Sequence, residues 1–281
     1  MPQKITKNKA YIQLHIAVFL FGFTAILGKL ITLEQTALVW NRLWIAVLGL
    51  IFIPGVFRGI RTISVSNLLK FSGIGVLVAL HWLTFYGSIK IGQSASVTLA
   101  CLATASLFTS ILEPVITKSK FQWIELVLGL IVIVGIYFLS GVGTQYYLAI
   151  IIGIISAFLA ALFSTLNKKY IANQNTLSVT TIELSSGFLC ISMAYPLIQT
   201  YMPQTHWMPH GDDWLWLILL GLLCTSLAFA LAINSLKVLS AFISNLSINL
   251  EPVYGILLSI WLLNEDAILN ADFYIGTTII L

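Results

Sequence analysis

YYLAIIIGIISAFLAALFSTLNKKY, residues 146–170, is the stretch that decides the fold. No charged residue interrupts it before Lys168 and Lys169 at its end. A helix needs about 20 mainly apolar residues to cross about 30 Å of hydrocarbon. Strands of a transmembrane β-barrel would instead alternate apolar and polar residues over about ten positions. The stretch therefore predicts a membrane-spanning helix.

The composition extends this prediction to the whole chain. Of the 281 residues, 59% are hydrophobic and only 9% are charged, whereas about a quarter are charged in a soluble domain. The mean hydropathy is +0.98. We expect an all-α polytopic membrane protein with ten transmembrane helices, near residues 10–31, 36–54, 67–88, 93–115, 121–140, 146–170, 176–201, 212–235 and 239–262, with a tenth beginning near 271. The first span is interpreted as retained because it is long and lacks a convincing cleavage site.

Basic residues in the loops predict the orientation. With a cytoplasmic N-terminus, 11 of the 14 basic residues fall on the cytoplasmic side: Lys4, Lys7, Lys9, Arg58, Arg61, Lys70, Lys118, Lys120, Lys168, Lys169 and Lys237. Positive charge concentrates on that side of membrane proteins. We expect a multi-pass protein of the plasma (inner) membrane with both termini cytoplasmic. The net charge of +4 thus reflects topology, and no nucleic-acid partner is expected.

Ten spans divide into two sets of five, and an odd number per set inverts the second set in the membrane. A shift of 147 residues places Lys90 opposite Lys237 and Glu125 opposite Asp272. We expect two inverted five-helix repeats, residues 1–142 and 143–281. The last helix, beginning near 271, is too short to span and is predicted to be truncated.

The string Leu-Glu-Pro-Val occurs twice, at 112–115 and 250–253. The 147-residue shift does not superpose the two copies. Glu113 lies near the cytoplasmic end of its predicted span, close to Lys118 and Lys120. We expect Glu113 to form a surface ion pair.

Glu251 lies about twelve residues into its predicted span, close to mid-bilayer. A charge there costs about 2.5–3.5 kcal/mol on insertion scales, so it normally faces a cavity or a partner. Pro252 lacks an N–H and should kink the helix and free carbonyl groups near Ile248. We predict a substrate or coupling site at Glu251; the alternative is a pairing that only fixes helix packing.

Further polar side chains in spans are candidates for the same site. Asn245 and Asn249 are solute contacts or interhelical hydrogen-bond partners. On an ideal helix Asn245 points about 120° away from Glu251, by the rotation of about 100° per residue. Arg42 and Glu183 contact the solute or a gate, or extend toward the nearest membrane surface.

His81 is a candidate proton relay, because its unperturbed pKa is about 6.5, or a packing residue. Tyr86 and Tyr254, with Trp40 and Trp82, are candidates for an aromatic wall. Single aromatic residues in helices more often belong to the core.

The stretch AINSLKVLSAFISNLSINLEPVYGILLSIWLLNE, residues 232–265, resembles the second half of the EamA-type family of the drug/metabolite transporter superfamily. The resemblance covers essentially the whole chain. The first half of the chain departs from the family pattern at Ala105, where the family often has Pro, and at Lys118, where the family often has Glu. The resemblance implies a transporter of small metabolites, often amino acids or other organic solutes leaving the cell, with a cavity between the halves.

We therefore expect a secondary transporter and exporter working by alternating access, with a small-molecule solute and the lipid bilayer as partners. Proton coupling and a homodimer stay open. The alternatives are a non-transporting membrane scaffold and an intramembrane enzyme. The sequence has no G-x-S-x-G, H-E-x-x-H or Walker-type motif, so no enzyme activity, catalytic residue, cofactor or metal is expected. His206 and His210 lie in a predicted outer loop and could bind a metal with Asp212 or Asp213. Pro209 interrupts the helical spacing that would bring the two His together, so we interpret them as part of a solvated loop.

Overall fold

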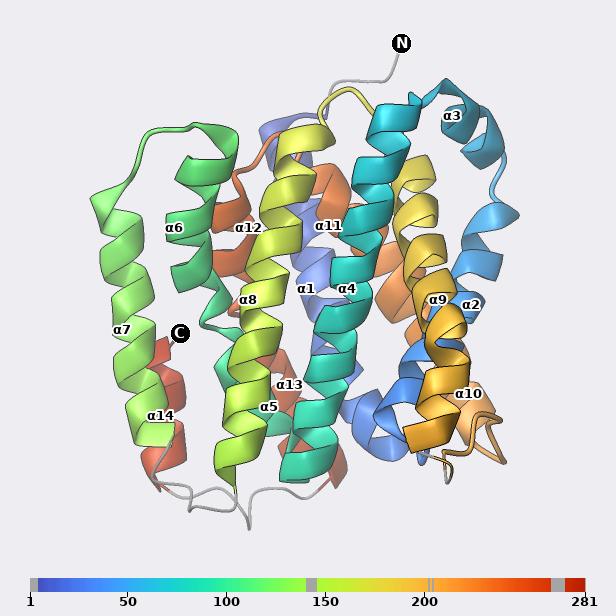
Figure 1. Cartoon of the computed structure of the whole chain (residues 1–281). Coiled ribbons are helices and arrows are strands. Elements are labelled where there is room, and N and C mark those ends of the chain that lie inside the picture. The colour runs from blue at the N-terminus through green and yellow to red at the C-terminus, as the bar shows by residue number, and fades with distance from the viewer. Residues whose placement is uncertain (1–4, 140–145, 202, 204, 264–270, 281) are drawn as a thin grey trace.

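The computed structural model describes residues 5–139, 146–201, 203, 205–263 and 271–280, and this part of the chain contains helices and no strand. The elements are α1 (Lys7–Leu30), α2 (Gln35–Ile51), α3 (Val56–Thr62), α4 (Val65–Gly92), α5 (Ala95–Leu102), α6 (Ala105–Thr117), α7 (Trp123–Leu139), α8 (Tyr147–Tyr170), α9 (Thr176–Tyr201), α10 (Asp213–Gly221), the π-helix η2 (Leu222–Leu227), α11 (Ala228–Ser235), α12 (Ala241–Ile248), α13 (Glu251–Leu263) and α14 (Ala271–Ile280). They form a bundle (Figure 1).

Each predicted segment falls on one helix or on consecutive helices. Within the described residues, six helical stretches are long and apolar enough to cross a membrane. A seventh is added if α2 and α3, which meet at 95°, count as one bent span. The chain is thus a multi-pass helical membrane protein, and α14 is only 10 residues long where the structure describes it.

The deciding stretch forms α8, which packs against α4, α5 and α6. Its small residues allow this close approach. A Cβ added at Gly153 would come 2.9 Å from Cβ of Cys101 on α5. Gly153 therefore lets α8 lie close to α5, as small residues do between membrane helices.

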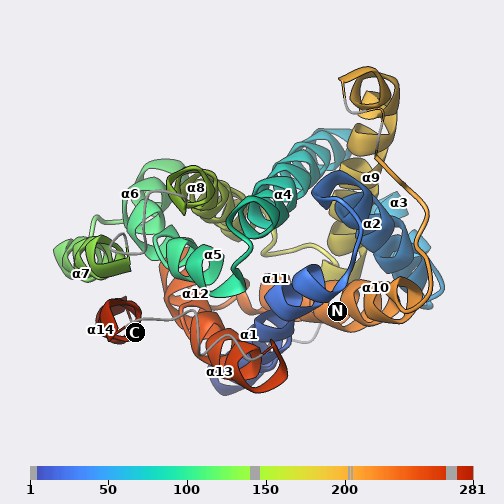
Figure 2. The same ribbon diagram turned by 90° about the horizontal axis from the view of Figure 1, so that it is seen from below.

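Helices from the two ends of the chain are interleaved. The first helix, α1, packs against α11 and α13, while α8 packs against α4. Figure 2, which looks along the bundle, shows α1 beside α11 and α13, and shows α7 with α14 at one edge. The surfaces that face one another inside the bundle therefore come from distant parts of the sequence.

Two predicted spans are broken near their middle. The first is interrupted at Ala103 and Thr104, between α5 and α6, and the second at Asn249 and Leu250, between α12 and α13. The second break lies where the sequence predicts a kink at Pro252, which occupies the first turn of α13. A proline is tolerated there because the first N–H groups of a helix have no intrahelical partner.

The two broken spans begin in the same way. Ser94 caps α5 by accepting a hydrogen bond from the backbone N–H of Val97, and Ser240 caps α12 by accepting one from Ile243. The two capping serines are 146 residues apart in the sequence. This spacing differs by one residue from the 147-residue shift that relates Lys90 to Lys237.

Candidate functional site

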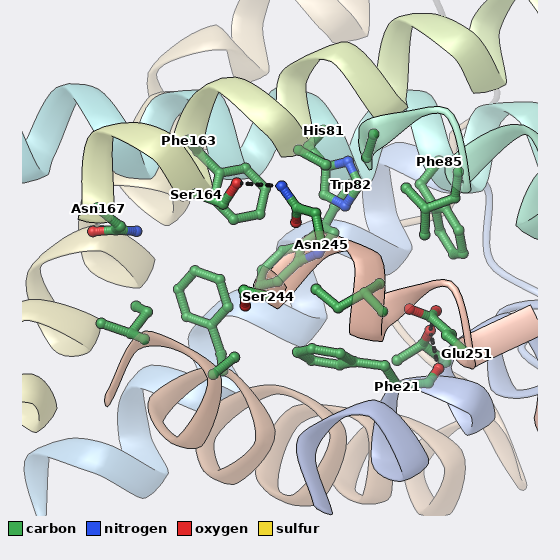
Figure 3. A pocket seen from close by; sticks show the side chains of 18 of the residues that line it. Phe21, His81, Trp82, Phe85, Phe163, Ser164, Asn167, Ser244, Asn245 and Glu251 are labelled. Carbon is green, nitrogen blue, oxygen red and sulfur yellow. Dashed lines mark hydrogen bonds between the residues drawn. The ribbon is translucent and has the colours of Figure 1, made fainter. Parts of the chain in front are cut away.

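A cavity of about 80 Å³ lies inside the bundle. A water molecule needs about 10–15 Å³ of such volume, so the space suits several waters or a small solute. Its walls come from α1, α2, α4, α5, α6, α8, α11, α12 and α13. The polar lining residues are Thr24, Arg42, His81, Ser164, Asn167, Ser244, Asn245 and Glu251. Most other lining residues are aromatic or aliphatic (Figure 3).

Arg42 of α2 is 1% exposed and lines this cavity. Its Nε donates to Thr225 Oγ1 at 2.6 Å, and its Nη1 donates to the Tyr86 hydroxyl at 2.9 Å. Its Nη2 lies 3.4 Å from the Cys224 carbonyl oxygen. The guanidinium carbon is 3.7 Å from the Trp82 ring centroid. Arg42 is thus fixed inside the protein and does not extend to the membrane surface.

The π-helix η2 provides part of this support. Thr225 donates its hydroxyl proton to the Leu220 carbonyl oxygen at 2.6 Å and can therefore only accept from Arg42. Single π turns are common at functional sites. Sequence reasoning missed Thr225, because a lone hydroxyl in an apolar run gives no signal of its partner.

Glu251, the first residue of α13, is 4% exposed and lines the cavity. Its Oε1 lies 3.5 Å from the Thr24 hydroxyl. Thr24 makes a shorter bond, 2.6 Å, to the Phe21 carbonyl oxygen, so Glu251 is weakly held. Within the described residues no cation forms an ion pair with Glu251. The arrangement leaves the carboxyl group available to the cavity.

Asn245 of α12 lines the same cavity as Glu251. Its Nδ2 donates to Thr109 Oγ1 at 2.7 Å and to Ser164 Oγ at 2.8 Å, so it also joins α12 to α6 and α8. An unbroken helix would point Asn245 away from Glu251. The break between α12 and α13 brings both to one space. Asn249 is buried, with Nδ2 3.5 Å from Ser106 Oγ, and does not line the cavity.

His81 of α4 lines the cavity beside Phe85 and Phe163, with ring centroids 6.1 Å and 5.4 Å away. Its Nδ1 lies 2.9 Å from both the backbone oxygen and the hydroxyl of Ser156. These contacts orient the imidazole from α8. Both the proton-relay and the packing interpretations of His81 fit this placement.

Besides Asn249, the predicted residues Tyr86, Glu183 and Tyr254 also lie outside the cavity lining. Tyr86 is fully buried and holds Arg42. Glu183 is fully buried and accepts a hydrogen bond at 3.2 Å from Nδ2 of Asn167, a lining residue. Tyr254 packs edge-on against Phe19, with ring centroids 5.5 Å apart. Asn167 was missed because it precedes two lysines and resembles a helix end.

The predicted surface ion pair of Glu113 is wrong. Glu113 is 7% exposed and accepts backbone hydrogen bonds from Ala241 at 3.0 Å and from Phe242 at 2.7 Å. Its carboxyl group thus caps the N-terminus of α12, where free N–H groups and the helix dipole favour an anion. The carboxyl reaches across the bundle because α6 packs against α12.

The loop residues His206 and His210 are exposed and border a second hollow with Thr32 and Glu34. Among the described residues, no group of three His, Cys, Asp or Glu side chains is close enough to hold a metal ion. Asp213 instead accepts two hydrogen bonds from Thr32, from its N–H at 2.8 Å and its hydroxyl at 2.7 Å.

Comparison with known proteins gives the same family twice along the chain. The model of the EamA-like transporter family matches residues 8–141 and again residues 147–281. An uncharacterized transporter, YxxF, of Bacillus subtilis (strain 168) is 23% identical over 264 residues, which is 90% of this chain and 81% of that protein. A protein of known crystal structure has the same fold, with a TM-score of 0.73, 16% identity and coverage of 98% of this chain and 94% of that one. The chain therefore belongs to the EamA-like transporter family, within the drug/metabolite transporter superfamily, and is a membrane transporter.

Proposed function

We propose that the protein is a secondary transporter that exports small organic solutes, amino acids or related compounds, across the plasma (inner) membrane by alternating access. The observation that carries the proposal is the pair of opposite charge types on one buried cavity, Arg42 and Glu251. An intramembrane ionisable residue normally marks a solute or ion pathway. Two such residues on one cavity favour a solute that bears both a carboxylate and an amine.

The arrangement around Arg42 suits recognition of a carboxylate. A guanidinium offers five N–H donors in a planar fork that matches carboxylate geometry. The three contacts of Arg42 use neutral acceptors, so its positive charge is not neutralised by a carboxylate of the described residues. Trp82 and Tyr86 hold the fork in place. We assign carboxylate binding to Arg42 and amine or proton binding to Glu251.

We also propose that the chain forms ten spans in two inverted five-helix repeats, residues 1–142 and 143–281, with both termini cytoplasmic. Support comes from the double family match and from the equivalent caps at Ser94 and Ser240. A second pair of contacts corresponds as well. Lys90 Nζ donates to the Ile31 carbonyl oxygen at 2.7 Å, and Lys237 Nζ donates to the Gln174 carbonyl oxygen at 2.8 Å. Movement of such repeats about a central site is the usual form of alternating access.

Flux measurements in proteoliposomes test the proposal. Amino acids and related solutes are loaded, and efflux is followed with and without a pH gradient. We expect Glu251→Gln to abolish efflux or its response to the gradient, because the amide cannot exchange a proton. Glu34→Gln, which removes an exposed carboxyl, is the matched control and should behave as wild type. Absence of flux for every solute with folded wild-type protein would leave the scaffold and enzyme alternatives, and full gradient-driven flux in Glu251→Gln would remove Glu251 from coupling.

A further inference from the structure

Buried oxygen atoms without hydrogen-bond partners concentrate on α8 and α9. Within the described residues they are Thr165 Oγ1, Asn167 Oδ1, Thr180 Oγ1 and Glu183 Oε1. Buried polar groups are normally paired, and each exception needs an explanation. The central members are Asn167 and Glu183, because a hydrogen bond joins them and Asn167 also lines the cavity.

Among the described residues, Glu183 has one polar side-chain contact for two carboxyl oxygens. Asn167 Nδ2 lies 3.2 Å from Oε2, while Oε1 has no partner there. Both side chains are fully buried. A buried carboxylate without a cation is so costly that the group normally takes up a proton instead. The site thus holds a proton acceptor whose one hydrogen-bond donor, among the described residues, is the Asn167 amide.

No charged side chain of the described part supplies a counter-ion. The elements packed against α9 are α2, α3, α4 and α11, and α8 reaches Glu183 through Asn167. The titratable residues of these five elements are Arg42, Arg58, Arg61, Lys70, His81, Tyr86, Lys90, Tyr147, Lys168, Lys169 and Tyr170. None forms an ion pair or a hydrogen bond with Glu183. Lys168, next to Asn167, donates instead to the Leu236 carbonyl oxygen at 2.9 Å.

The packing of α9 at this point does not depend on the carboxyl group. A Cβ added at Gly75 would clash with the Glu183 backbone oxygen, so α4 and α9 approach through their main chains. Ser186 also donates to the Ser72 carbonyl oxygen at 2.9 Å. Because these contacts already fix the two helices, helix packing alone gives no reason for an acidic side chain at position 183.

We propose that Glu183 carries an exchangeable proton and that Asn167 connects it to the cavity. Figure 3 shows Asn167 and Glu251 at opposite ends of the lined space. The cavity then has two protonatable carboxyl groups, Glu251 in its wall and Glu183 behind Asn167. The proton site stands on its own, whereas its role in coupling rests on the proposed transport function.

Infrared difference spectroscopy of the full-length protein in lipid vesicles tests the proton site directly. A pH jump is applied, and the carbonyl stretch of protonated carboxyl groups is followed. We expect one band that is lost in Glu183→Gln, kept in the control Glu34→Gln, and altered in frequency and slower in hydrogen–deuterium exchange in Asn167→Leu. Absence of any difference between wild type and Glu183→Gln across the pH range of the folded protein would overturn the proposal.

The same spectra are recorded with sodium and with potassium as the only cation. Loss of the Glu183 band in sodium alone would make this a sodium site and overturn the proton assignment. A band that is indifferent to the cation supports it.

Solute flux tests the coupling role separately. We expect Glu183→Gln to keep exchange of solute across the membrane without a gradient and to lose the stimulation by a pH gradient. Gradient stimulation equal to wild type would overturn the coupling role. If wild type moves no solute, the transport proposal fails, while the infrared band still decides whether Glu183 holds a proton.

Discussion

Removal of the Glu113 carboxyl should loosen the contact between α6 and α12. Glu113 accepts the backbone N–H groups of Ala241 and Phe242, and Ser240 accepts that of Ile243. Three of the four free N–H groups at the start of α12 are therefore satisfied by side chains. Two of these three hydrogen bonds are made to Glu113 of α6, so this cap also links α6 to α12.

The expected cost follows from these bonds. Each buried N–H left without an acceptor costs about 1–3 kcal/mol, so Glu113→Ala should lower the free energy of unfolding by about 4 kcal/mol. Glu113→Gln keeps one acceptor oxygen and should lose about 2 kcal/mol by the same reasoning. Ser240→Ala removes an ordinary N-cap and should lose about 1 kcal/mol.

Unfolding by dodecyl sulfate in mixed micelles, followed by tryptophan fluorescence, measures these differences. Glu125→Gln on α7 is the control, because Glu125 is only partly buried and no hydrogen bond to its carboxyl group is present in the described part of the chain. The cap predicts the order Glu113→Ala, Glu113→Gln, Ser240→Ala and control, from most to least destabilised. A value for Glu113→Ala within about 1 kcal/mol of the control is what a surface ion pair would give and would refute the cap.

Two further substitutions test packing and the cavity. Gly75→Ala should lower the free energy of unfolding by about 1–3 kcal/mol or more, because the new Cβ meets the Glu183 backbone oxygen. The control Gly73→Ala has open space around its Cβ and should be neutral or stabilising. Equal losses of unfolding free energy for the two variants in the same assay would contradict the close approach of α4 and α9. Trp82→Leu removes the aromatic ring that lies over the Arg42 guanidinium, an interaction worth about 2 kcal/mol when desolvated. Solute affinity, measured by thermal stabilisation at increasing solute concentration, should therefore fall by roughly 30-fold. Unchanged affinity would show that the Trp82 ring has no part in solute recognition.

Long apolar runs made the membrane helices predictable. α8 begins and ends within one residue of its predicted bounds, because its charge-free run is followed at once by two lysines. The break between α5 and α6 was not predictable in the same way, since no proline or glycine lies at Ala103 or Thr104. At this break the Thr104 hydroxyl donates to the Cys101 carbonyl oxygen at 2.7 Å. Such local side-chain hydrogen bonds compete with the backbone hydrogen bonds of the helix. They can end a helix inside a membrane where surrounding helices cover the backbone groups that the break frees.

The candidate site was predictable only where charge or polarity stands out against hydrocarbon. Arg42, His81, Asn245 and Glu251 were selected on that ground, and all four line the cavity. Glu113 was misjudged because nearby lysines are visible in sequence, whereas its partners lie 128 and 129 positions away. The backbone N–H donors of such a long-range contact leave no local pattern in the sequence.

The two Leu-Glu-Pro-Val strings show that similar helices need not carry similar chemistry. Glu251 starts α13 and faces the cavity, whereas Glu113 lies near the end of α6 and caps α12. The residue that starts α6, and so corresponds to Glu251 by the helix breaks, is Ala105, which also lines the cavity. One broken span therefore offers a methyl group where the other offers a carboxyl group. Of the two equivalent positions, 105 and 251, only position 251 offers a carboxyl group to an amine of the solute. The cavity can therefore bind such a solute in one orientation, even though the α5–α6 and α12–α13 spans are both broken near their middle.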